Sequence, residues 1–272
     1  MTPNPRHLIL KLLGAEGGPL SARDAIDACA VFGIRENSVR VALVRLSAAG
    51  MIEAEGRGTY RIGPKAAELA EDVRAWRTAE SRVRKWSGAW IAVHCGGLER
   101  RDRTGLRQRD RALQLLGFRE LDRGLFVRPD NLAGGVTEVR SRLYKLGLHA
   151  EAAVFEVRSF DDEREARARS LWNGKALTKS YVQMRQRLEK WLMRAKCLDL
   201  EVAARESFLL GNDAIRRLVF DPLLPQPLAD VSERRAFVDA VLELDRVGHA
   251  IWRKLSSPEG AEEPREDASP HH

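Results

Sequence analysis

The sequence has no long apolar run, only 6% aromatic residues and three cysteines in 272 positions. A membrane-spanning helix needs roughly 18 consecutive apolar residues, and no run approaches that length. The first residues, MTPNPRHLILKLLGAEGG, lack the basic lead and the small-residue cleavage site of a secretion signal. We therefore expect a cytoplasmic protein.

The cysteines and histidines are too scattered to indicate a disulfide framework or a metal site. Neither a CxxC pair nor metal-ligand spacing of histidines occurs, so no cofactor or metal is predicted. We expect plain buried or semi-buried thiols and isolated imidazoles. These residues are Cys29, Cys95, Cys197, His94, His149 and His249.

Positive charge is in excess, since the formal net charge at pH 7 is +7. With 44% hydrophobic and 31% charged residues, the composition is that of a globular protein, and the length suits two or three domains. A basic surface attracts polyanions, of which nucleic acid is the commonest in a cytoplasm. Charge alone is weak evidence, so a docking element is needed.

Residues 1–65 contain such an element. Helical patterns cover about Pro5–Gly14, a segment capped by Ser21, and Asn37–Ala49. Strand-like pieces follow at about Met51–Glu55 and Thr59–Ile62, joined by a tip that contains Gly56, Arg57 and Gly58. Three helices and a hairpin in about 60 residues predict a winged helix-turn-helix DNA-binding domain.

The third helix has two different faces. Val39, Leu43 and Leu46 recur at helical spacing and predict the buried face. The other face offers arginines, which bind guanine or phosphate, and valines, which contact thymine methyl groups. The predicted DNA-binding residues are Asn37, Ser38, Arg40, Val41, Val44 and Arg45 of the helix and Arg57 and Arg61 of the hairpin.

The rest of the chain divides into four predicted parts. Residues 66–85 resemble a solvated connecting helix, and 86–161 alternate strands with helices, with one more strand near Arg119–Leu121 or in the C-terminal part. That order predicts a small ferredoxin-like α+β sandwich. Residues 162–256 are mostly helical, with a break near Asn173–Gly174, a proline-bracketed loop DPLLPQPL and a last helix capped by Ser232. Residues 257–272 are acidic, contain proline and are expected to be disordered.

Several motifs along the chain resemble one known family. They are SVRVALVRLSAAGMIEAEGRGTYRIG, KWSGAWIAV, LGFRELDRGLFVRPDNL, SYVQMRQRL and, most specifically, IRRLVFDPLLPQPL. Over about residues 5 to 255 the chain resembles the PaaX-like family, the phenylacetic acid degradation repressors. The resemblance implies a dimeric repressor that is released from a palindromic operator by a small effector. In the best-known members the effector is an aromatic acyl-CoA thioester such as phenylacetyl-CoA.

The resemblance also implies a middle domain similar to the CRISPR-associated adaptation nuclease fold. In that fold a metal-binding carboxylate ends the first strand, whereas here the strand ends His94-Cys95-Gly96. We therefore expect no enzyme. Two departures affect the effector side: LADVSERR replaces the family's Trp-Pro-Gly, and Trp172-Asn173-Gly174 replaces Trp-Asp-Leu.

An acyl-CoA needs an apolar pocket with a few polar anchors. The candidate effector-binding residues are Trp172, Tyr181, Arg216, Arg217 and Asp221. The alternative is a structural role for each: Asp221 caps the loop or pairs with Arg217, and the tryptophans, Trp191 and Trp252 included, belong to the core. Met184 and Met193 are expected as core fillers.

A second function from a different class remains open. The basic middle segment LERRDRTGLRQRDR is compatible with an RNA-binding or accessory protein. The lack of exposed aromatic residues for base stacking in that segment argues against it.

Overall fold

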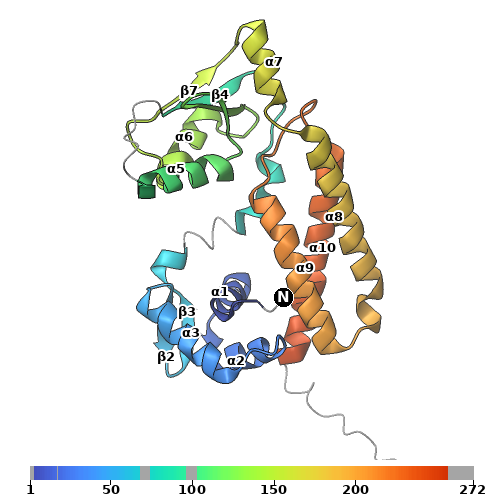
Figure 1. Cartoon of the computed structure of the whole chain (residues 1–272). Coiled ribbons are helices and arrows are strands. Elements are labelled where there is room, and N and C mark those ends of the chain that lie inside the picture. The colour runs from blue at the N-terminus through green and yellow to red at the C-terminus, as the bar shows by residue number, and fades with distance from the viewer. Residues whose placement is uncertain (1–2, 17, 68–73, 96–102, 257–272) are drawn as a thin grey trace, which may run out of the picture. The chain divides into compact units, whose positions relative to one another are not determined.

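The computed structural model describes residues 3–16, 18–67, 74–95 and 103–256 (Figure 1). The chain forms two compact units, each assembled from separate stretches of sequence. Unit 1 takes residues from 1–74, 190–212 and 243–272, and unit 2 takes residues from 75–189 and 213–242. The predicted α+β class is confirmed.

Unit 1 contains the predicted three helices and hairpin. The helices are α1 (Pro5–Glu16), α2 (Ala22–Ala30) and α3 (Glu36–Ala48). The strands are β1 (Leu20–Ser21), β2 (Ile52–Gly56) and β3 (Thr59–Ile62), in the antiparallel order β1-β3-β2. Strand β1 was not predicted, because two residues are too short to show a period of two.

Local sequence signals set the ends of these helices. The Ser21 hydroxyl accepts a hydrogen bond from the Asp24 backbone amide at 3.0 Å, which confirms Ser21 as the cap of α2. Gly33 and Gly50 have φ angles of 69° and 68°, a conformation that favours glycine and ends α2 and α3 with tight turns.

The core of unit 1 extends beyond the winged helix. Phe208 of α9 (Leu200–Val219) meets Phe32 edge-on, with ring centroids 5.2 Å apart. Trp252 of α10 (Val231–Ser256) stacks on Phe32 at 6.3 Å. Two C-terminal helices therefore pack against the winged-helix core within this unit.

Unit 2 contains a four-stranded antiparallel sheet. Its elements are β4 (Trp90–His94), α5 (Arg103–Leu115), β5 (Arg119–Asp122), β6 (Leu125–Pro129), α6 (Gly135–Lys145) and β7 (Ala153–Val157). The strand order β5-β6-β4-β7 and the βαββαβ sequence are those of a ferredoxin-like fold. Strand β5 confirms the predicted extra strand near Arg119–Leu121.

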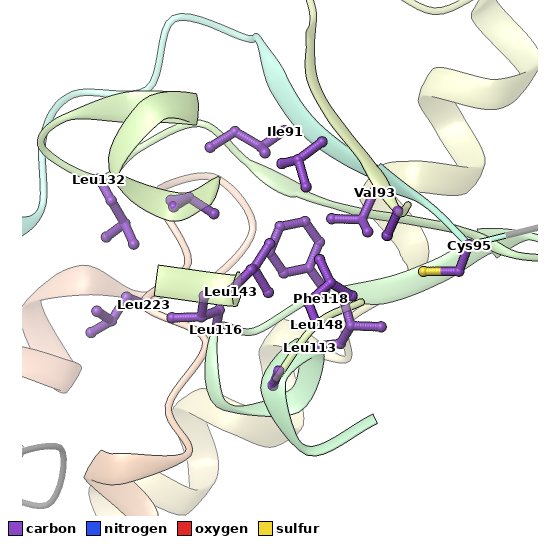
Figure 2. Close-up of a cluster of buried hydrophobic side chains, with 14 of the residues drawn as sticks. Ile91, Val93, Cys95, Leu113, Leu116, Phe118, Leu132, Leu143, Leu148 and Leu223 are labelled. Carbon is purple, nitrogen blue, oxygen red and sulfur yellow. The ribbon is translucent and has the colours of Figure 1, made fainter. Parts of the chain in front are cut away.

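Both faces of β4 are buried, which explains its unbroken apolar run. Ile91 and Val93 lie in the cluster under α5 and α6, together with Leu113 and Leu143 (Figure 2). Trp90 and its neighbours on the opposite face form a second cluster, which includes Trp172.

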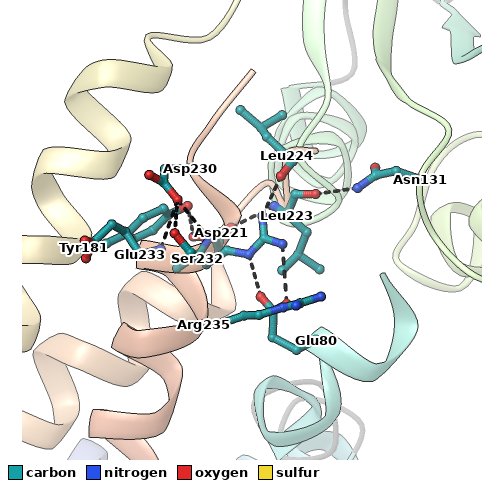
Figure 3. Close-up of polar contacts among 11 residues, drawn as sticks. Glu80, Asn131, Tyr181, Asp221, Leu223, Leu224, Asp230, Ser232, Glu233 and Arg235 are labelled. Carbon is teal, nitrogen blue, oxygen red and sulfur yellow. Dashed lines mark hydrogen bonds and ion pairs between the residues drawn. The ribbon is translucent and has the colours of Figure 1, made fainter. Parts of the chain in front are cut away.

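The proline-bracketed loop joins the two clusters. The consecutive residues Leu223 and Leu224 belong to the first and the second cluster, respectively. The buried Asn131 amide donates a hydrogen bond to the Leu223 carbonyl at 2.7 Å, and Arg234 donates one to the Leu224 carbonyl at 2.6 Å (Figure 3). The DPLLPQPL motif therefore anchors the loop against the sheet of unit 2.

The long C-terminal helices follow the predicted break. Helix α7 (Asp162–Ser170) ends before Asn173, and α8 (Gly174–Arg194) begins at Gly174. A Cβ atom on Gly174 would lie 1.8 Å from the Leu228 carbonyl oxygen, so this position has room only for glycine.

Some local predictions differ from the structure. Within the predicted connecting helix, Ala75–Thr78 and Glu80–Arg82 are 3₁₀ turns, and Trp76 is buried rather than solvated. Residues 68–73 of that segment and the predicted disordered tail, 257–272, lie outside the described residues.

Three single-residue predictions are wrong. Met193 is 77% exposed and not a core filler, because it lies on the solvent side of α8. Cys197 is exposed, unlike the other two cysteines. The side chain of Asp230, not of Ser232, caps α10 by accepting hydrogen bonds from the amides of Ser232 and Glu233.

Candidate functional site

Helix α3 separates its two faces as the sequence predicts. Val39, Leu43 and Leu46 are buried in unit 1. Val41 and Val44 are 42% and 67% exposed, and among the described large apolar side chains only Met193 is more exposed than Val44. The predicted contact residues of α3 are all exposed: Asn37, Ser38, Arg40, Val41, Val44 and Arg45.

The hairpin of β2 and β3 carries the remaining predicted contacts. Arg57 lies at the tip and is exposed, and Gly58 next to it has a φ angle of 74°, which closes the turn. Arg61 is exposed on β3. The hairpin therefore presents one arginine at its tip and one on a strand.

The arginines of this surface differ in their partners. Arg40 pairs with Glu36 at 2.7 Å and Arg61 pairs with Glu53 at 3.1 Å. Among the residues that the structure describes, Arg45 and Arg57 have no acidic partner. Exposed ion pairs are worth less than about 1 kcal/mol, so all four guanidinium groups are available to an anionic ligand.

Of the predicted effector residues, Tyr181 and Asp221 lie together. The Tyr181 hydroxyl donates a hydrogen bond to the Asp221 carboxylate at 2.6 Å, and its ring stacks on Phe237 at 5.9 Å. Burial raises the pKa of both Tyr181 and Asp221. Asp221 also accepts from the Leu223 amide at 2.8 Å, so it caps the proline loop, as the structural alternative proposed.

The other effector candidates lie elsewhere. Trp172 is buried and stacks on Trp90 at 6.1 Å in the second cluster of unit 2. Arg217 is exposed and pairs with Asp213 at 3.3 Å, and Arg216 is exposed beside it. These five side chains are therefore distributed between core and surface positions.

The structure contains buried charges that the sequence did not reveal. Arg128 is buried and donates to the backbone carbonyls of Leu116 and Pro129 and to the Asn131 side chain. Burial lowers the pKa of Arg128 to about 10. Arg234 is fully buried and pairs with Glu80 (Figure 3). Arg234 stands beside the exposed Arg235, so the sequence does not single it out, and Arg128 is the one charged residue of the apolar strand β6.

The described part of the chain contains neither a metal-binding cluster nor a membrane-spanning helix. It contains no group of three or more His, Cys, Asp or Glu side chains that could hold a metal ion. Within the same residues, no helix is long and apolar enough to cross a membrane.

A winged helix with an exposed, arginine-bearing third helix, followed by a ferredoxin-like domain and long helices, is an architecture suited to transcriptional regulation. Family models agree: one described as PaaX-like protein matches residues 5–66, and one described as PaaX-like protein C-terminal domain matches residues 172–254. The chain belongs to the PaaX-like family, which is known as a family of transcriptional regulators.

Among solved structures, the chain is similar to an uncharacterized protein, Rv0674, from Mycobacterium tuberculosis. The two share 23% sequence identity with a TM-score of 0.59, over 92% of this chain and 99% of the other. This likeness concerns the fold alone. No curated protein matches the sequence at a significant level.

Proposed function

We propose that this protein is a sequence-specific DNA-binding repressor that reads its operator with α3 and the hairpin of β2 and β3. The observation that carries the proposal is the outer face of α3, where two exposed valines lie between arginines. Small apolar side chains on the outer face of a recognition helix contact thymine methyl groups in the major groove.

Four of the predicted contact residues have distinct roles in this proposal. Arg45 binds guanine or a phosphate from within the groove, and Val44 contacts thymine. Arg57, at the hairpin tip, reaches the backbone or the adjacent minor groove. Arg40 exchanges its exposed pair with Glu36 for a phosphate, at little cost.

The proposal extends to assembly and signal. A homodimer with two-fold symmetry would set two copies of α3 about one DNA turn, or roughly 34 Å, apart on a palindrome. Family membership supports release by a small effector, and we propose an acyl-CoA thioester such as phenylacetyl-CoA. The exposed pair Arg216 and Arg217 is a candidate for its phosphates, because arginine binds phosphate bidentately.

The test is a gel-shift titration with the DNA upstream of the protein's own gene. Arg40→Ala/Arg45→Ala should lose specific binding, whereas Lys175→Ala/Lys179→Ala, which removes two exposed charges from α8, should bind as the unmodified protein does. If the arginine variant binds the operator as tightly as the lysine variant does, the role of α3 is refuted. A panel of acyl-CoA esters added to the complex tests the effector, and release by none of them would remove that part of the proposal.

A further inference from the structure

Helix α5 of unit 2 carries an exposed row of arginines. Arg103, Arg107 and Arg111 recur every four residues, and all three are exposed. Residues with this spacing lie on one side of a helix. The opposite side, with Ala112 and Leu113, is buried against the sheet. We call Arg103, Arg107 and Arg111 the α5 arginine row.

The row has no compensating acid among the residues that the structure describes. Among the described carboxylates, Asp110 is the nearest in sequence, and it pairs with Arg109 at 2.7 Å. Asp102, next to Arg103 in the sequence, lies outside the described residues. The guanidinium of Arg109 also lies over the Phe126 ring, 5.7 Å from its centre, so Arg109 is not part of the row. Within the described residues, the three arginines of the row therefore have no acidic partner.

Helix α7 of the same unit pairs its arginines with acidic side chains. On α7, Arg164 pairs with Asp161 at 2.6 Å, and Arg169 pairs with Glu165 at 2.7 Å. The first turn of α7 is acidic, as the helix dipole favours, whereas the first turn of α5 has no acid and contains Arg103. Like charges four residues apart destabilise a helix. Departures from local rules of this kind occur at functional sites, where a ligand can supply the opposite charge.

The spacing of the row fits a polyanion. A helix rises 1.5 Å per residue, so the row spans about 12 Å. Duplex DNA carries one charge per about 1.7 Å of its axis, so about seven phosphate charges fall within that length. Arginine is well suited to phosphate because its guanidinium binds two oxygens at once.

We propose that the α5 arginine row is a second DNA-binding surface, which contacts the phosphate backbone without reading sequence. The choice of DNA as the polyanion rests on the proposed function, since the winged helix brings a duplex to the same chain. Contacts of this kind supply affinity and salt dependence but no base specificity.

The experiment is a fluorescence-anisotropy titration of a labelled, mixed-sequence duplex of about 40 bp over a range of salt concentrations. Arg107→Gln/Arg111→Gln removes two charges from the row. Lys175→Gln/Lys179→Gln is the matched control, because it removes two exposed charges at the same helical spacing from α8. Thermal unfolding of each variant establishes that it folds.

If two phosphate contacts are lost, the slope of log affinity against log salt should fall by about 1.8, and affinity at low salt should fall at least about tenfold. The control should match the unmodified protein. A slope for the α5 variant equal to that of the control would overturn the proposal. The proposal would also be overturned if the α5 variant lost affinity for an RNA of similar length but not for DNA, since the row would then bind RNA.

A winged-helix variant, Arg45→Gln/Arg57→Gln, separates this proposal from the proposed function. Weakened binding in the α5 variant alone would leave the α5 row as a DNA contact and refute the winged-helix site. Weakened binding in the winged-helix variant alone would do the reverse. Additive losses in a combined variant would support both surfaces.

Discussion

The buried ion pair of unit 2 gives a sharp prediction about stability, because two adjacent arginines reach the same carboxylate. Arg234 is fully buried and binds Glu80 and the Leu224 carbonyl. Arg235 lies 3.6 Å from the other oxygen of Glu80, but its side chain is 64% exposed. Arg234 and Arg235 are therefore the same kind of residue with the same acidic partner, and they differ in how deeply they are buried.

Replacing Arg234 with Met leaves the Leu224 carbonyl without its donor, at a cost of about 1–3 kcal/mol. It also removes the closest cation from Glu80, whose side chain is only 19% exposed. Breaking a buried pair typically costs about 3–5 kcal/mol, and Arg235 can compensate for part of this. We expect a loss of about 3 kcal/mol for Arg234→Met and less than about 1 kcal/mol for Arg235→Met.

The assay is urea unfolding followed by circular dichroism and tryptophan fluorescence, with the slope of the transition checked for constancy. The variant that removes both charges, Arg234→Met with Glu80→Gln, should recover part of the loss, because no buried carboxylate remains unpaired. Equal losses for Arg234→Met and Arg235→Met would refute the assignment of this energy to burial.

Three further predictions concern other parts of the chain. Gly117→Ala should cost at least about 2 kcal/mol in calorimetry, since Gly117 has a φ angle of 73° and a Cβ atom would lie 2.7 Å from the Pro222 Cα. Phe208→Ala should destabilise unit 1 by about 2–3 kcal/mol in chemical unfolding, because the ring contacts Phe32, and an unchanged transition would contradict this packing. Burial lowers the pKa of Lys11 from 10.5 to about 8, so the unfolded state binds more protons between these values and stability should rise with pH across them. Lys11→Met should abolish that rise, and its persistence in the variant would exclude Lys11 as the cause.

The sequence predicted most of the fold because its signals are local. Helix α3 followed from the spacing of Val39, Leu43 and Leu46, and the turns after α2 and α3 followed from Gly33 and Gly50. Such patterns reflect which side of an element is buried and where the backbone needs a positive φ angle.

The missed features depend on contacts between distant segments. Phe208 and Trp252 pack on Phe32, but the sequence around these two residues does not predict which residue they contact. Arg128 lies in the apolar strand β6, but the carbonyls and the amide that receive its hydrogen bonds come together only in the fold. The outer face of α3 was predictable, and so was the pairing of Arg40 with Glu36, since the two lie four residues apart on one helix.

The central claim is that α3 reads DNA sequence. The most direct measurement is the ratio of affinities for the gene's own upstream region and for a scrambled duplex of the same composition, at one fixed salt concentration. Specific regulators bind their sites at least about 10³-fold more tightly than other DNA, and we predict a ratio of that order. A ratio near one would contradict the claim and leave only backbone binding.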